Sequence, residues 1–353
     1  MMGPGMRRLC RLLMRGMLVL LIVVLGFASP VVYVETMCRE DAVSQVSTPL
    51  AERTRSATRT LMTYPEWHIV HAYDDYAEII SRRDPHDFGY WSAITGYWRI
   101  VCDLTRASAA LGEVDGETRQ MIHIIGVSFT FEMLLKAAYE ESIGRLVTWV
   151  RGPEQSALDQ LSARQAAAYA EFLQQVPWYR YDFRADAAAL RAASQGTFRD
   201  RERAIALGLE HHARAAYAGL IAQAVEAVGQ DELTLEMVVA DLDPRILEAA
   251  DGVRLLRMTE QGALVETPRY RKLTGILFDW AQAGARFVEI AGNDQIMFTA
   301  ISQRSGQEGA LADLPRQGYG DTRHLFLIPV GELGGALRNL EENGLQLEHV
   351  HDY

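Results

Sequence analysis

The sequence predicts an α+β protein: an N-terminal transmembrane helix, then an all-α helical domain, then a smaller α/β domain. Three observations predict this class. Residues 17–34 form an uncharged apolar run. Residues 56–250 repeat apolar side chains at helical spacing, with glycine and proline where helices should end. Residues 251–353 instead alternate short apolar runs, typical of strands, with shorter helical segments.

The apolar run reads MLVLLIVVLGFASPVVYV and, at about 1.5 Å per helical residue, is just long enough to cross a bilayer core of roughly 30 Å. Residues 1–16 contain four arginines and no acid, whereas acids appear from Glu35 onward. Because positive flanks stay on the cytoplasmic side, we expect a cytoplasmic N-terminus and an exported bulk. This predicts a single-pass protein of the bacterial inner membrane, with a stalk over residues 35–55 and its bulk in the periplasm.

A cleaved signal peptide is the alternative for this segment. Its cleavage site requires small residues in an A-x-A-like pattern, and Gly26, Ala28 and Ser29 are small. However, Pro30 follows at once and the apolar run resumes through Val34. We therefore favour an uncleaved signal-anchor helix.

The charge of the chain argues against some partners. The whole sequence has a formal net charge of −11, and without residues 1–34 the exported part has 31 basic and 46 acidic residues, a net charge of −15. Contact with nucleic-acid phosphates needs a basic surface, so we expect no nucleic-acid partner. The same charge predicts that the exported surface stays soluble and away from anionic lipid, which leaves one N-terminal helix as the membrane contact.

Two of the three cysteines, Cys38 and Cys102, lie in the exported part, where an oxidising compartment permits a disulfide between them. The alternative is two unpaired cysteines, one in the stalk and one in a core. The sequence contains no C-x-x-C motif, which argues against thioredoxin-like redox chemistry.

The C-terminal segments are predicted as strand, helix, strand, strand, helix and strand, from residues 253–258 to residues 345–350. That order resembles a ferredoxin-like α/β sandwich with one extra strand. Residues 285–292 and 295–302 flank an Asn-Asp pair, which is a hairpin signal. Fold alone does not fix function, but small sandwiches often dimerise or bind ligands. We expect a protein partner or homo-oligomer through this domain.

Residues 121–135, MIHIIGVSFTFEMLL, raise the question of a second membrane span. The run has fifteen residues and carries His123 and Glu132. Its length and charge favour a buried helix of the core over a span.

The stretch TYPEWHIVHAYDDYAEII holds the strongest candidate site. Thr63 and Glu66 are spaced as a capping box, which predicts a helix start. At about 100° per residue, a helix places His68, His71 and Asp75 on one face. Two imidazoles and a carboxylate suit a divalent metal such as zinc, or a histidine base whose tautomer an acid fixes.

Three interpretations of this face remain open. A metal site would need further ligands from other helices; Glu132 is the first candidate, with His123 and Glu140 as others. A catalytic site would use the same two histidines and the aspartate in a hydrolase or lyase. In the third interpretation the helix closes a core, and its histidines bond to carboxylates and tyrosines.

Aromatic residues on this helix and the next could line a ligand pocket. They are Tyr64, Trp67, Trp91, Tyr97 and Trp98. Tyrosine hydroxyls and tryptophan N–H groups would orient an apolar or ring-shaped ligand. The alternative is ordinary core packing by aromatic side chains.

His349 and His351 alternate as residues on one face of a strand do, but a frayed and exposed chain end is the interpretation we favour for them. No complete catalytic signature is present in the sequence. We therefore expect a membrane-anchored periplasmic binding or accessory protein with a polar and aromatic cleft in its helical domain. A metal- or His/Asp-assisted periplasmic enzyme is the alternative.

Overall fold

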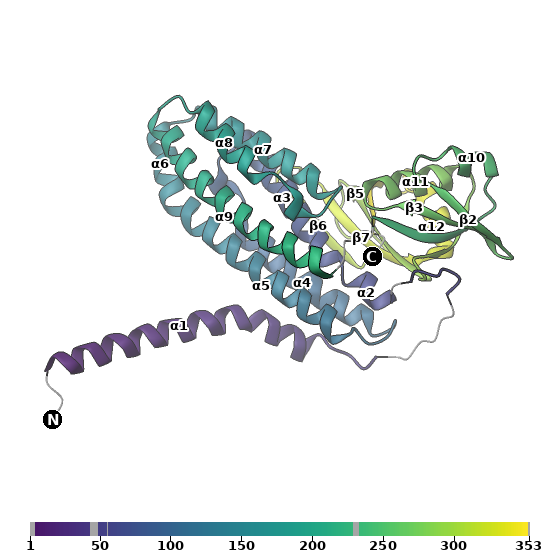
Figure 1. Cartoon of the computed structure of the whole chain (residues 1–353), viewed down its shortest axis with the longest axis horizontal. Helices are drawn as coiled ribbons and strands as arrows, with labels where there is room; N and C mark the ends of the chain where they lie inside the picture. The colour runs from purple at the N-terminus through teal and green to yellow at the C-terminus, as the bar shows by residue number, and fades with distance from the viewer. Residues whose placement is uncertain (1–3, 43–48, 55, 229–232, 352–353) are drawn as a thin grey trace.

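The structure is a computed structural model that describes residues 4–42, 49–54, 56–228 and 233–351 (Figure 1). It contains an N-terminal apolar helix, a bundle of helices and two four-stranded antiparallel sheets. The predicted mixed class of helix and sheet is therefore confirmed. The bundle and the sheets lie next to each other along the molecule, and the N-terminal helix extends away from the bundle (Figure 1).

Helix α1 (Pro4–Met37) contains the predicted apolar run and also the basic segment before it. Its stretch Leu13–Met37 is apolar and long enough to anchor in a membrane, a test that a signal sequence near the N-terminus also passes. Most side chains of this stretch are exposed, but Val34 is buried against the bundle. The C-terminal end of α1 is thus part of the folded structure.

A disulfide fastens this end of α1 to the bundle. Cys38 follows α1 directly, and Cys102 lies in α4; the two are bonded with a Cα–Cα distance of 5.2 Å. Of the two states that the sequence left open for these cysteines, the structure has the bonded one.

The bundle consists of helices α2 (Ala57–Leu61), α3 (Tyr64–Arg82), α4 (Tyr90–Ser108), α5 (Gly116–Tyr139), α6 (Arg145–Arg151), α7 (Ala157–Leu173), α8 (Phe183–Ala193) and α9 (Phe198–Val228). A π-helical turn, η2 (Glu140–Gly144), joins α5 to α6. Local signals set several ends. Ser156 and Asp159 form a capping box at the start of α7, and Gly152, with a φ of 84°, ends α6.

The capping box predicted at the start of α3 is wrong. Thr63 has helical φ and ψ angles of −86° and −20°, and its hydroxyl donates to the carbonyl of Thr60 at 2.8 Å. Helix α2 ends two residues earlier, so its carbonyl groups are available to this hydroxyl. Pro65 has no N–H group, which leaves one donor fewer to be capped at this end.

Sheet one has the strand order β2-β3-β1-β4. Its elements are β1 (Thr234–Ala240), α10 (Pro244–Ala249), β2 (Arg254–Thr259), β3 (Gly262–Pro268), α11 (Arg271–Gln282) and β4 (Arg286–Ile290). The sheet therefore begins at Thr234, earlier than the predicted domain boundary at residues 250 and 251. The reason is that β1 is buried on both faces, and its apolar run over residues 237–240 is short enough to fit a strand or a helix equally well.

Sheet two has the order β6-β7-β5-β8. Its elements are β5 (Gln295–Ser302), β6 (Ala312–Pro315), β7 (Thr322–Pro329), α12 (Val330–Arg338) and β8 (Gln346–His351). In each sheet the first strand pairs with the third and the fourth, so the second unit repeats the first with a loop in place of its first helix. The expectation of a single sandwich with one extra strand is therefore wrong.

The predicted hairpin around Asn293-Asp294 is also wrong. Strand β4 pairs with β1, and β5 pairs with β7 and β8, so the two strands belong to different sheets. Ala291 and Gly292, with φ of 51° and 81°, turn the chain between them. Local turn residues indicate that the chain reverses, but not that its flanking strands pair with each other.

The two sheets share a core with α11 and α12 but have different coverings on their other faces. Trp280, Phe287, Phe298 and Val350 lie in the shared core. The other face of sheet one is covered by residues 49–54, which we call the strap. The other face of sheet two packs against α3 of the bundle.

Candidate functional site

The three predicted residues of helix α3, His68, His71 and Asp75, face two different neighbours. The ring of His68 points to α4, where its Nε2 lies 3.0 Å from the carbonyl oxygen of Ala93. Gly96 makes room for this ring, since a Cβ there would lie 2.8 Å from His68 Cε1. Burial lowers the pKa of His68 to about 4. His68 is therefore separated from its two predicted partners.

His71 and Asp75 face sheet two instead. His71 Nδ1 lies 3.9 Å from Glu348 Oε1 of β8, and Asp75 Oδ2 accepts the N–H of Gln317 at 3.0 Å. Burial raises the pKa of Asp75 to about 7, and burial together with the nearby Arg323 lowers the pKa of His71 well below its usual value. At neutral pH the imidazole is therefore neutral.

Arg323 of β7 and Glu348 of β8 form the ion pair at the centre of this contact. Arg323 Nη2 donates to Glu348 Oε1 at 2.7 Å. Burial acts against the charge of Glu348, but the guanidinium of Arg323 prevails and holds the pKa of the carboxyl below its usual range. The guanidinium is 3% exposed and the carboxylate 16%, so this pair lies inside the protein.

The two C-terminal histidines are buried in the same contact, so the expectation of a frayed, exposed end is wrong. The ring of His349 lies against Trp67 of α3, with centroids 3.9 Å apart. His351 makes edge contacts with Trp67 at 5.1 Å and Tyr64 at 4.9 Å. Burial lowers the pKa of His349 to about 3 and that of His351 well below its usual value. Helix α3 covers these two residues of β8 and buries them. The local sequence around β8 does not specify this covering helix.

We call this set of side chains the interdomain cluster. Its members are Tyr64, Trp67, His71, Asp75, Thr299, Arg323, Glu348, His349 and His351. Hydroxyl groups satisfy some ring nitrogens: His349 Nδ1 lies 3.1 Å from Thr274 Oγ1, and His351 Nε2 lies 3.3 Å from Thr299 Oγ1. Other buried atoms have no direct hydrogen-bond partner among the described residues, namely Tyr64 Oη, His71 Nε2, Asp75 Oδ1, His349 Nε2 and His351 Nδ1.

The structure does not bring the predicted metal ligands together. Glu132 accepts from Tyr73 Oη at 2.6 Å and pairs with Arg214, and His123 Nε2 lies 2.8 Å from Glu35 Oε1. Within the described part of the chain, no group of three or more His, Cys, Asp or Glu side chains is arranged to hold a metal ion.

The five aromatic residues predicted to line one pocket are dispersed. Tyr97 donates its hydroxyl to the carbonyl of Ile122 at 2.8 Å, and Trp98 Nε1 donates to Thr130 Oγ1 at 3.0 Å, so both lie in the bundle core. Trp91 is 67% exposed. Tyr64 and Trp67 belong to the interdomain cluster. Core packing and domain contact therefore account for four of them.

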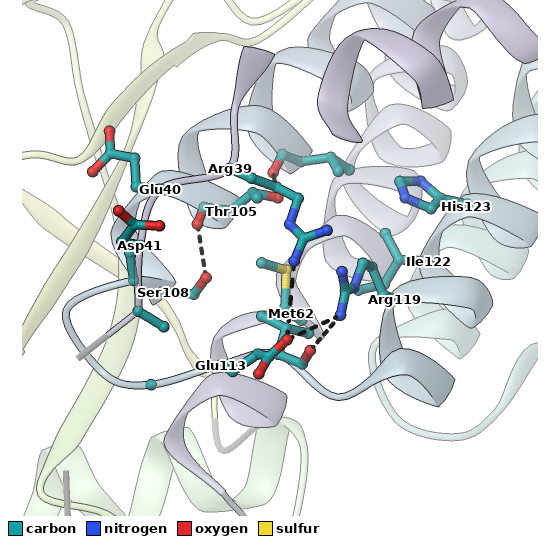
Figure 2. Close-up of a pocket in the computed structure, with 15 residues that line it drawn as sticks. Arg39, Glu40, Asp41, Met62, Thr105, Ser108, Glu113, Arg119, Ile122 and His123 are labelled. Carbon is teal, nitrogen blue, oxygen red and sulfur yellow. Dashed lines mark hydrogen bonds and ion pairs between the residues drawn. The ribbon is translucent and has the colours of Figure 1, made fainter. Parts of the chain in front are cut away.

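An open cavity of about 290 Å³ lies elsewhere, where α1 meets α4 and α5; we call it the anchor cleft (Figure 2). Met62 and His123 line it together with two arginines and three acids, Arg39, Arg119, Glu40, Asp41 and Glu113. Arg39 and Arg119 converge on Glu113, with nitrogen–oxygen distances of 3.9 Å and 3.8 Å (Figure 2). The sequence analysis missed Arg39, Glu113 and Arg119, because they lie in the stalk, in a loop and in the first turns of α5 without a local motif.

Comparisons with protein-family models, with curated proteins and with solved structures found no match to this chain.

Proposed function

We propose that this chain is a membrane-anchored binding or accessory protein of the periplasm, attached to the bacterial inner membrane by α1 with its N-terminus in the cytoplasm. The observation that carries the proposal is the anchor cleft. It opens where the apolar helix ends, and the Cys38–Cys102 disulfide joins α1 to α4 beside two lining residues, Arg39 and Val101. A bond at this place holds the cleft in a fixed position relative to the anchor.

The chemistry of the anchor cleft suits a small ligand that carries a carboxylate or phosphate. Glu113 is 73% exposed and meets both guanidiniums only at 3.8 to 3.9 Å, so these contacts contribute little. An anionic group of a ligand could take its place and bond to the planar guanidiniums with better geometry. Arg119 Nε is buried without a direct hydrogen-bond partner among the described residues, which provides a further donor. The volume is at the lower end of small-molecule sites.

We further propose that each sheet with its helices is a ferredoxin-like unit and that this C-terminal region serves assembly with a partner protein or a second copy. The shared strand order supports the first part. Edge strand β2 supports the second, because Leu255 and Met258 on it are 45% and 69% exposed.

The second candidate is a periplasmic hydrolase or lyase that uses the interdomain cluster. The buried His71 Nε2 and Asp75 Oδ1 without direct partners favour it, because polar atoms left unpaired inside a protein are more frequent at reactive sites. The position of His68 and the burial of both groups between two domains speak against it. Elemental analysis of the purified full chain and of His71→Ala tests the metal version: a stoichiometric metal in the parent that is lost in the variant would support the enzyme.

Thermal unfolding of the full chain in detergent, with and without millimolar citrate, inorganic phosphate or a phosphomonoester, tests the binding proposal. We expect at least one of these anions to raise the melting temperature of the parent. Arg119→Gln should abolish the rise, and Arg164→Gln, an exposed arginine on α7, should retain it. A parent that none of the anions stabilises, or a rise that Arg119→Gln retains, would contradict the assignment of the cleft.

A further inference from the structure

Over residues 121–140 and 203–223, which belong to α5 with its C-terminal end and to α9, the acidic and basic side chains face the inside of the bundle. Lys136 of α5 pairs with Glu210 of α9 at 3.0 Å, and Glu140, at the end of α5, pairs with Arg203 of α9 at 2.8 Å. Glu132 pairs in the same way with Arg214. The three pairs follow each other along two antiparallel helices and hold α5 and α9 side by side.

The outward side of the same two helices is apolar. We call it the α5–α9 face; its residues are Met121, Ile124, Phe131 and Leu135 of α5 and Leu209, Tyr217 and Leu220 of α9. Each of these side chains is between 39% and 72% exposed. The four charged residues within residues 121–139 and 204–223, Glu132, Lys136, Glu210 and Arg214, are at most 35% exposed and pair with one another. On a helix of a water-soluble bundle, charges lie outside and apolar residues inside.

The opposite side of the bundle has the ordinary polarity. The outward residues of α7 include Gln160, Arg164 and Glu171, and those of α8 include Arg184 and Arg191. The bundle is therefore two-sided, with water-compatible helices on one side and the α5–α9 face on the other. A contiguous apolar surface of this kind marks contact with protein or membrane.

The position of α1 identifies the occupant. Phe27 of α1 contacts Phe131 of the α5–α9 face, with ring centroids 5.9 Å apart, and Glu35 of α1 bonds to His123, the residue directly before Ile124. The apolar surface of the anchor thus continues directly into the α5–α9 face. Helix α1 leaves the bundle from this side and extends away from it (Figure 1). A membrane that surrounds α1 therefore reaches the face as well.

We propose that the α5–α9 face lies in the lipid of the same membrane that α1 anchors in, with its side chains among the acyl chains. Amphipathic helices that bind in this way bury their apolar side about 5–10 Å deep. The residues of α5 that the sequence assigned to a buried core helix are then half buried in protein and half in lipid. The net charge of −15 does not oppose this contact, because the exposed surface of the face carries none of the charged residues.

Nitroxide labels on the full chain test the proposal. In a Cys10→Ser background the other two cysteines are bonded, so single cysteines at Leu135→Cys and Leu220→Cys can be labelled selectively. Leu21→Cys in α1 provides a lipid reference and Arg164→Cys on α7 a water reference. Each protein is placed singly in phosphatidylcholine nanodiscs, and power saturation measures its collisions with oxygen, which enters lipid, and with a water-soluble nickel chelate.

We expect positions 135 and 220 to match position 21, with frequent oxygen and rare nickel collisions. Nickel collisions as frequent as at position 164 would overturn the proposal. Protection from both reagents would also overturn it, because a second copy or another protein segment would then cover the face. A phospholipid with a photoreactive acyl chain provides the same test on the unaltered chain: cross-links should map to α5 and α9, and their absence there would contradict the proposal.

Discussion

Sheet one and sheet two have the same strand order, but they are covered by different kinds of structure. The strap over sheet one is extended chain, and its N–H groups are bonded by carboxylates: Leu50 and Ala51 donate to Glu289 at 2.6 and 2.8 Å, and Glu52 donates to Glu236 at 2.9 Å. Sheet two faces α3, a helix whose own N–H groups are used inside the helix.

The comparison shows how the covering element determines the chemistry of the sheet beneath it. An extended segment brings free backbone donors, so two buried carboxylates receive hydrogen bonds without a fully buried cation beside them. A helix brings side chains only, so the carboxylate of Glu348 requires Arg323, and the histidines beside it remain neutral. Buried titratable groups therefore accumulate over sheet two.

Lowering the pH should have the largest effect, and it should reach sheet two first. The folded pKa of His349, about 3, lies below its value of about 6.5 in an unfolded chain, so stability is complete above 6.5 and is lost as the pH falls. Burial also lowers the pKa of His68, His71 and His351, so their contributions to stability are lost in the same direction as the pH falls. Asp75 has the opposite sign, since its folded pKa of about 7 means that protonation stabilises the fold. Because four histidines act in one direction and one aspartate in the other, the net free energy of unfolding should fall on acidification.

We expect the free energy of unfolding to fall by on the order of 5 kcal/mol between pH 6.5 and 4.5. Hydrogen exchange should then rise first in β8 and α3. Despite partial burial, Arg53 and backbone N–H groups hold the pKa of Glu236 below its usual value, so its contribution is lost only below about pH 4.5. Exchange that rises in β1 before β8 on acidification would contradict the comparison.

Removal of Arg323 should cost about 3–5 kcal/mol of unfolding free energy, because Arg323→Met leaves Glu348 buried without its cation. Denaturant unfolding at pH 7 measures it, and Arg323→Met/Glu348→Met should recover most of the loss. Arg53→Met is the matched change over sheet one. Arg53 pairs with Glu236 at 3.0 Å but is 39% exposed, so we expect a cost of about 1 kcal/mol or less. Equal costs for the two arginines would show that the coverings do not differ.

Neutralising the acceptor under the strap should have an intermediate effect. Glu289→Gln weakens the bonds to Leu50 and Ala51, and we expect a loss of about 1–2 kcal/mol together with faster proteolysis within residues 49–54. Glu260→Gln, at the exposed turn between β2 and β3, is the control and should change neither. An unchanged cleavage rate in Glu289→Gln would mean that the carboxylate does not hold the strap.

His71→Leu should have the smallest effect at pH 7, about 1 kcal/mol or less in either direction. Glu348 keeps its ion-pair partner Arg323 when His71 is lost, and His71 Nε2 has no direct hydrogen-bond partner among the described residues, so the substitution leaves no buried carboxylate unpaired. At pH 5 the variant should be more stable than the parent, because it has one proton fewer to bind on unfolding. Denaturant unfolding curves at both pH values measure this difference. A variant that loses several kcal/mol of unfolding free energy at pH 7 would show that His71 makes a stabilising contact in the interdomain cluster.

Local signals in the sequence predict much of the helical bundle. Gly152 and Pro153 end the long helical segment where the structure ends α6 at Arg151, and the apolar run forms the core of α1. Strand β1 is missed because its apolar run over residues 237–240 is too short to show a helical or a strand period. The two-sheet arrangement is missed because strand pairing joins segments that are distant in the chain, and a turn such as Ala291-Gly292 does not reveal its partners.

The candidate site could be predicted only in part for the same reason. Helical spacing places His71 and Asp75 on one side of α3, which the structure has, but a face of about 60° can meet two neighbours, and His68 lies at the α4 side of it. Arg323 and Glu348 have no local pattern, since they meet only when β7 and β8 lie in one sheet. The burial of His349 depends on α3, which lies far away in the sequence.

The strap imposes an order on the synthesis and folding of this protein. It is among the first segments to emerge after α1, yet its acceptor Glu289 is separated from Leu50 by 239 residues. While the chain is being made, residues 49–54 must wait until the whole bundle and the first sheet have followed. The segment between Leu50 and Glu289, which includes the bundle, is then a loop, and the bond between these two residues closes it last. A chain that ends before β4 would lack Glu289, so protection of the strap would report that the chain has been made and folded through β4.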